Sequence, residues 1–127
     1  MSFIFDFYSS ELERVEVGEQ VACLRFSAAH VMRREGNHGD APGYAAPLEM
    51  IFSGASWLGE PSRCIGGIAD GWITIDGLRS SRLPLPLEAG PVHLELRLIS
   101  GTQLSIDAAH VSCAAPAPDQ FVESYAC

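Results

Sequence analysis

The clearest pattern of hydrophobic and polar positions lies in residues 91–113, PVHLELRLISGTQLSIDAAHVSC. Apolar and polar residues alternate on both sides of Ser100-Gly101, which is the period of a β-strand with one buried face. The two halves are therefore predicted to form a hairpin. A three-residue loop, Ser100–Thr102, keeps the large aliphatic side chains on one face, whereas a two-residue loop mixes the faces. This loop predicts four cross-strand pairs: Leu98 with Leu104, Leu96 with Ile106, Leu94 with Ala108 and Val92 with His110.

A second clear strand is predicted over residues 20–32, QVACLRFSAAHVM. In regular alternation its core face would carry Leu24, Phe26, Ala28, His30 and Met32. Before it, the alternation of phenylalanines in residues 3–7 predicts a short strand. The spacing Ser10-x-x-Glu13 is that of a capping box, so a brief helical turn is expected there, running into a strand that ends at Gly18.

The remaining segments are read from turn residues. Residues 33–47, RREGNHGDAPGYAAP, lose all periodicity and are predicted to form a long loop, and residues 54–61 are expected to be irregular around Trp57. Residues 67–83 are predicted to form a hairpin, with turn dipeptides at Asp70-Gly71 and Asp76-Gly77. A type I′ turn at Asp76-Gly77 would direct Ile73, Ile75, Leu78 and Ser80 to the core and Trp72 and Thr74 outward. Residues 84–91 form a Pro-rich edge or connector, and residues 114–127 a tail with a last short strand over 121–125.

These elements predict an all-β chain of 127 residues that forms one domain, 1–127. The expected architecture is an antiparallel β-sandwich or partly open barrel of about seven to eight strands, with at most one short helical turn. An apolar run of the roughly 20 residues needed for a membrane helix is absent from the sequence. The N-terminus lacks the basic start and small-residue cleavage site of a signal peptide, so we expect a cytoplasmic protein that does not bind membranes.

The charge balance is strongly acidic. The chain has 16 acidic residues against 8 basic ones, a formal net charge of −8, and all eight basic residues are arginines. Acidic residues concentrate near the N-terminus, where Glu11, Glu13 and Glu16 follow one another closely. Such a surface repels phosphate backbones, which argues against nucleic-acid binding, and would suit a basic protein partner. The alternative is that the acidity only maintains solubility.

The four cysteines, Cys23, Cys64, Cys113 and Cys127, lack the C-x-x-C spacing of metal or redox motifs. We expect reduced structural thiols, with Cys127 as the last residue.

Two segments share the sequence Ala-Ala-His-Val at the same distance from a leading leucine: LRFSAAHVM at 24–32 and LSIDAAHVS at 104–112. In regular strands His30 and His110 would both lie on apolar faces, with Ala28 and Ala108 leaving space beside them. Three interpretations follow: two hydrogen-bonded structural histidines, the floor of a ligand pocket, or two ligands of a metal site. A zinc site would need a third ligand, for which His38, Asp40 or His93 is available, so the metal remains open and no cofactor is predicted.

Catalysis has weaker support in the sequence. Asp107, His110 and Cys113 suggest parts of a nucleophilic site, but their odd separations direct His110 to the opposite face from the other two in a regular strand. Familiar nucleophile and phosphate-loop motifs are absent from the sequence, so a non-catalytic protein is favoured. On the outer face of the closing hairpin, Glu95 is predicted to pair with Asp107. Trp57 and Trp72 are the candidate anchors for a partner, or they pack against the long loop.

The order of these features resembles small uncharacterised all-β domains of bacteria. The resemblance rests on FYSSELERVEV, VACLRFSAAHV, DGWITIDG with LPLPL, and GPVHLELRLISGTQLSIDAAHV, which together cover most of the chain. Some domains of this kind are encoded beside polymorphic toxins as immunity proteins. Many of them carry a His-Asp pair before the serine where this chain has Phe7-Tyr8-Ser9, so no functional residue is carried over.

The sequence therefore predicts a non-catalytic protein-interaction module, in its concrete form an immunity-type protein whose acidic surface, with Glu11, Glu13 and Glu16, caps a basic toxin. The alternative is a small-molecule or metal-binding β-domain with a pocket at His30 and His110.

Overall fold

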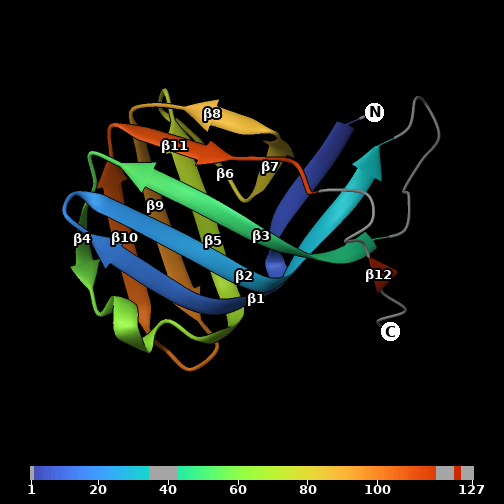
Figure 1. Ribbon diagram of the computed structural model, residues 1–127, viewed down its shortest axis with the longest axis horizontal. Coiled ribbons are helices and arrows are strands. Elements are labelled where there is room, and N and C mark those ends of the chain that lie inside the picture. Colours follow the sequence, from blue (N-terminus) through green and yellow to red (C-terminus); the bar gives the residue numbers. More distant parts are fainter. Residues whose placement is uncertain (1, 35–42, 117–121, 124–127) are drawn as a thin grey trace.

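The computed structural model describes residues 2–34, 43–116 and 122–123, and its described residues form one antiparallel sheet (Figure 1). Eleven strands and a two-residue strand, β12, make up this sheet, more than the seven to eight predicted. One turn of 3-10 helix, η1 (Pro61–Arg63), is also present. Within these described ranges, no helix is both long enough and apolar enough to cross a membrane. The strands are β1 (Ser2–Gly18), β2 (Val21–Arg34), β3 (Gly43–Ser53), β4 (Ser56–Gly59), β5 (Gly66–Ile75), β6 (Leu78–Ser80), β7 (Arg82–Leu85), β8 (Leu87–Ala89), β9 (Val92–Leu98), β10 (Gln103–Ala108), β11 (His110–Cys113) and β12 (Val122–Glu123).

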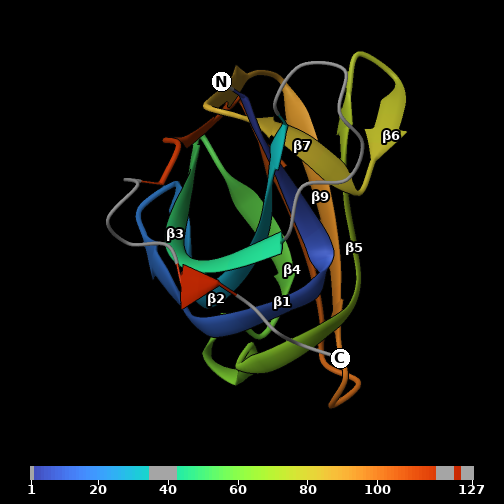
Figure 2. The same ribbon diagram turned by 90° about the vertical axis from the view of Figure 1, so that its right-hand side faces the viewer.

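The main path through the sheet is β4-β10-β9-β5-β1-β2-β3-β11-β8. Its end strands, β4 and β8, are not paired with each other in the described part of the chain, so the sheet is open. Strand β1 joins its two halves, because β1 pairs with β2 along most of its length and with β5 only at Glu11 and Leu12. Figure 2 shows how the sheet bends at β1, so that β5 and β9 face β2 and β3.

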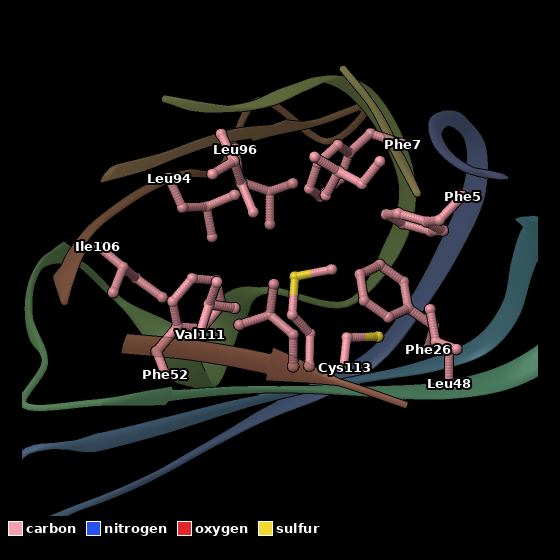
Figure 3. Close-up of a cluster of buried hydrophobic side chains, with 14 of the residues drawn as sticks. Phe5, Phe7, Phe26, Leu48, Phe52, Leu94, Leu96, Ile106, Val111 and Cys113 are labelled. Carbon is pink, nitrogen blue, oxygen red and sulfur yellow. The ribbon is translucent and has the colours of Figure 1, made fainter. Parts of the chain in front are cut away.

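The core fills the space between these two halves. Phe5, Phe26 and Phe52 come from β1, β2 and β3, and Leu94 and Ile106 come from β9 and β10 (Figure 3). All five are at most 2% exposed. Each is supplied by a strand with one apolar face, so alternation in the sequence builds the core directly.

The closing hairpin has the predicted faces but a different register. Leu96 pairs with Leu104 and Leu94 with Ile106, two residues away from the predicted partners. The loop is residues 99–101, closed by the N–H of Leu98 donating to the carbonyl of Thr102 at 2.9 Å. Gly101 has φ +96°, the positive value expected for a glycine in such a loop. A shift of two residues keeps each side chain on its face, so the predicted aliphatic set is still buried.

The predicted helical turn near Ser10 is wrong, because β1 continues through it as a strand with a bulge. Its pairing with β2 skips from Asp6 to Glu11, and Ser9 has φ +70°. The Ser10 hydroxyl donates to the carbonyl of Asp6 at 2.7 Å and accepts the N–H of His30 at 2.8 Å. The hydroxyl therefore satisfies backbone groups of two strands and caps no helix.

Two other segments are more regular than predicted. Residues 33–34 and 43–47 of the predicted long loop belong to β2 and β3, while the rest of that loop, with His38 and Asp40, lies outside the described residues. The segment around Trp57 is strand β4, which pairs with β10.

The second hairpin and the Pro-rich segment follow the prediction in part. Asp76 and Gly77 have φ of +52° and +78°, as a type I′ turn requires, but Leu78 beside them is 77% exposed and Ser80 is exposed. Asp70-Gly71 is not a turn and lies inside β5. The Pro-rich segment supplies edge strands, β7 on β1 and β8 on β11. The predicted last strand is present as β12, which pairs with β3.

Candidate functional site

His30 and His110 lie at opposite ends of strand β3 and do not share a pocket. His30 pairs with Ala45 near the start of β3, whereas His110 pairs with Ser53 at its end. Eight residues of extended strand separate these two positions, about 26 Å at about 3.3 Å per residue. The structure therefore does not bring together the two histidines of the predicted pocket.

Two irregularities explain why both histidines leave the apolar face. The pairing of β2 with β3 shifts between Phe26 and Ala29, so Ala29 enters the core while Ala28 and His30 are only half-buried. The chain also breaks at Ala109, between β10 and β11, so Ala108 is buried and His110 is exposed. A bulge or break of this kind reverses the alternation beyond it.

The structure holds no group of three His, Cys, Asp or Glu side chains suited to a metal ion within its described ranges, 2–34, 43–116 and 122–123. His38 and Asp40, two of the candidate third ligands, lie outside these ranges. His93, the third candidate, lies on β9, and both of its ring nitrogens contact carboxylates there and on β10.

A polar network covers the outer face of β9 and β10. His93 Nδ1 is 2.7 Å from Asp107 Oδ1, and its Nε2 is 2.7 Å from Glu95 Oε1. Ser105 Oγ donates to Glu95 Oε2 at 2.8 Å. The observed register makes these contacts, because it places His93 opposite Asp107 and Glu95 opposite Ser105. The predicted pairing of Glu95 with Asp107 is therefore wrong by the same two-residue shift.

The polar groups of this network hydrogen-bond to one another, and His93 does not contact the hydroxyl of Ser105. Hydrogen bonds to Asp107 and then to Glu95 raise the pKa of His93, because both carboxylates favour the imidazolium. A carboxylate faces each ring nitrogen, so the imidazole does not accept a proton from Ser105, whose hydroxyl bonds to Glu95 instead. This geometry lacks the serine–imidazole contact that acyl-transfer catalysis uses.

The two tryptophans have different environments. Trp57 in β4 is half-buried and packs against the core. Trp72 in β5 lies on the outer face, where the guanidinium of Arg79 is 4.0 Å from its ring centroid. Trp72 also lines a shallow depression of about 160 Å³ together with Glu95 and Arg97. Of the two predicted anchors, Trp72 is therefore the one on an outer surface.

The acidic residues predicted near the N-terminus all lie on β1 and are exposed, but they differ in their partners. Glu16 Oε1 is 2.9 Å from Arg14 Nε and also pairs with Arg25. The hydrogen bond from Arg14 is the main reason that the pKa of Glu16 is lowered. Arg25 bridges onward to Glu49 of β3 at 2.9 Å. The four side chains form a neutral chain across β1, β2 and β3.

Glu11 and Glu13 are different, because neither has an ion pair within the residues that the structure describes. Glu19, an exposed residue in the turn after β1, shares this property. Most arginines, in contrast, form an ion pair or a cation–π contact with another side chain of this protein. The internal arginine contacts are Arg14–Glu16, Arg25–Glu16 and Glu49, Arg63–Glu60, Arg82–Asp6, Arg97–Asp70 and Arg79–Trp72.

The candidate site is therefore the exposed side of β1, where Glu11 and Glu13 have no ion pair with the part of the chain that the structure describes. Comparison with known proteins adds no assignment: the chain matches no protein-family model, no curated protein and no solved structure.

Proposed function

We propose that this protein is a non-catalytic interaction module that binds a basic protein partner through the carboxylates of β1. Its concrete form is an immunity-type protein that caps a basic toxin in the cytoplasm. The resemblance in the sequence and the formal net charge of −8 support this form.

One observation carries the proposal. The arginines are largely used within the chain, whereas Glu11 and Glu13 are exposed on β1 without an ion pair in its described surroundings. The paired arginines stay at the surface, but their charge is offset by a neighbouring carboxylate, so the unpaired carboxylates are left as negative charge that a partner can meet. The excess of acid over base is therefore available for association.

The physical consequence is a steered, salt-dependent encounter. Exposed carboxylates attract a basic partner over about 10 Å at ordinary ionic strength and mainly raise the association rate. Direct contact then depends on side chains beside the carboxylates. Beside Glu13 lie Arg25 and Glu49, which are already paired with each other.

The test is affinity capture from the source cells, followed by quantitative binding of the purified partner. The variant Glu11→Arg/Glu13→Arg is compared with a control of equal charge change, Glu19→Arg/Glu88→Arg, whose two exposed carboxylates also lack an ion pair among the described residues. Glu16 is left unchanged because its reversal would also break two ion pairs. We expect a partner of basic isoelectric point, an affinity that falls between about 50 and about 200 mM salt, and at least tenfold weaker binding in the β1 variant alone.

Two results would reject the proposal. One is a partner that is neutral or acidic. The other is equal loss of affinity in the β1 variant and in the control, since that would show dependence on total charge without a defined surface.

A further inference from the structure

A pocket of about 300 Å³ opens where β1, β2 and β3 meet residues 114–116. Glu13 and Glu49 contribute carboxylates to its lining, and Arg25 contributes its guanidinium. Phe26 and Leu48 are buried core residues that also line it. The pocket lining thus combines apolar side chains with two carboxylates and one guanidinium.

The pocket has a local cause in the pairing of β2 with β3. Paired residues skip from Phe26–Leu48 to Ala29–Ala46, so Pro47 stands opposite two residues of β2. Proline has no N–H to donate, and a bulge leaves its extra residue unpaired. The ladder is therefore interrupted beside the pocket, and the segment that follows β11 borders the gap.

The charges around the pocket do not cancel. Arg25 is shared between Glu16 and Glu49, and Arg14 also pairs with Glu16, so these four side chains sum to zero. Glu13 adds a carboxylate with no ion pair in the described surroundings. One negative charge beside an apolar wall is complementary to a cation carried on an aliphatic stem.

We propose that this pocket receives an arginine side chain of the basic partner, with its guanidinium at Glu13 and its methylene stem against Phe26 and Leu48. A planar guanidinium binds a carboxylate with two parallel hydrogen bonds, and its weak hydration suits a half-buried position. Long cationic side chains pack their stems on apolar surface while the charge stays at the rim. This inference rests on the proposed function, because it names the group through which the partner is held.

The experiment titrates isotope-labelled full-length protein with N-acetylarginine N-methylamide and follows backbone amide shifts by NMR. We expect saturable shifts at Phe26, Leu48 and Ala115. Glu13→Gln should weaken binding about threefold to tenfold, as loss of a charged acceptor implies. Glu19→Gln is the matched control, since Glu19 is an exposed carboxylate outside the pocket lining, and it should leave the affinity unchanged.

A second variant tests the cavity itself. Ala114 lines the pocket and is exposed, so Ala114→Trp should block the pocket and abolish the shifts while circular dichroism and thermal unfolding stay those of the native protein. The lysine analogue should bind less tightly than the arginine probe. No saturable shift at these amides, or equal weakening in Glu13→Gln and Glu19→Gln, would overturn the pocket assignment.

The two proposals fail in different ways. If a basic partner binds Ala114→Trp as tightly as it binds the native protein, the pocket assignment is rejected and the proposed function stands. If the arginine probe binds as expected but the captured partner is not basic, the proposed function is rejected, and only the affinity of the pocket for an arginine side chain stands.

Discussion

Gly71 provides the sharpest test of how the two halves of the sheet pack together. It lies inside β5, paired with Leu96, and is buried. A Cβ atom at this position would lie 2.9 Å from both Cγ and Cδ1 of Phe7 and 3.0 Å from its Cβ. The Phe7 ring is fully buried and makes an edge contact with Phe5, at 4.8 Å between ring centroids. Cβ and Cγ are at the near end of the Phe7 side chain and cannot move away by a rotation of the ring, so Gly71→Ala should destabilise the fold.

The expected magnitude is the difference between two effects. An added methyl group in a filled core costs about 1–3 kcal/mol. Replacing glycine by alanine also restricts the unfolded chain and returns about 0.4–1 kcal/mol. At the midpoints of these two ranges, Gly71→Ala should then lower the free energy of unfolding by about 1.3 kcal/mol. Gly18→Ala is the matched control, because a Cβ there meets nothing within 4 Å, and it should be neutral or slightly stabilising.

Urea unfolding of both variants measures the effect, with thermal unfolding as a check at roughly 3–5 °C per kcal/mol for a chain of this size. Phe7→Leu provides a further control, since a smaller side chain should relieve the clash. The loss in the double variant Phe7→Leu/Gly71→Ala should therefore be smaller than the sum of the single losses. If Gly71→Ala is as stable as Gly18→Ala, or if the losses add, the described contact does not limit the packing.

Other predictions follow from side chains away from this contact. Ser10→Ala should lower the free energy of unfolding by about 1–3 kcal/mol in urea, because it leaves two backbone groups without their hydroxyl partner, whereas Ser10→Thr should lose less. His93→Gln removes an imidazolium whose pKa is raised, so its stabilising effect is fully present below the ordinary histidine pKa of about 6.5 and is lost as the pH rises through the raised value. The stability difference between native protein and His93→Gln, about a few tenths of a kcal/mol for so exposed a group, should therefore shrink from pH about 6 to pH about 9, and a constant difference would contradict the reasoning. Burial is the main reason that the thiol pKa is raised to about 11 for Cys23 and to about 12 for Cys113, so in a Cys127→Ser background both should react with iodoacetamide far more slowly in native than in urea-unfolded protein at pH about 8. Rapid labelling of the native protein, detected by peptide mass spectrometry, would show that these thiols are more accessible than the fold implies.

The closing hairpin shows what alternation can and cannot predict. Leu94, Leu96, Leu104 and Ile106 are buried as predicted, because the face of a strand residue depends only on whether its position is odd or even. Their cross-strand partners depend on the turn, and moving the loop from 100–102 to 99–101 shifts the register by two residues without exposing any of them. Faces are thus readable from the pattern, whereas register requires the turn geometry as well.

The two Asp-Gly dipeptides illustrate a second limit of prediction from the sequence. Asp76-Gly77 forms the predicted turn, because both residues adopt positive φ and the flanking residues pair across it. Asp70-Gly71 has the same local chemistry but lies within a strand, where the missing side chain makes room for Phe7. The sequence shows a glycine in both cases, and only the tertiary packing separates a turn from a close approach.

The predicted histidine pocket and the predicted acidic surface depended to different degrees on a correct prediction of the strands. The pocket at His30 and His110 depended on unbroken alternation along two strands, and the bulge after Phe26 and the break at Ala109 both reverse it. The acidic surface depended only on the exposure of glutamates that are close in sequence, and these side chains reach solvent from the observed strand as they would from the predicted helical turn. The position of Glu13 is therefore predictable from the sequence, but the pocket beside it is not, because the bulge in β2, Pro47 of β3 and the segment after β11 meet there only in the folded chain. Recognition by charge can thus be predicted from composition and pattern, whereas the shape that would select one side chain of a partner emerges from the irregularities of the sheet.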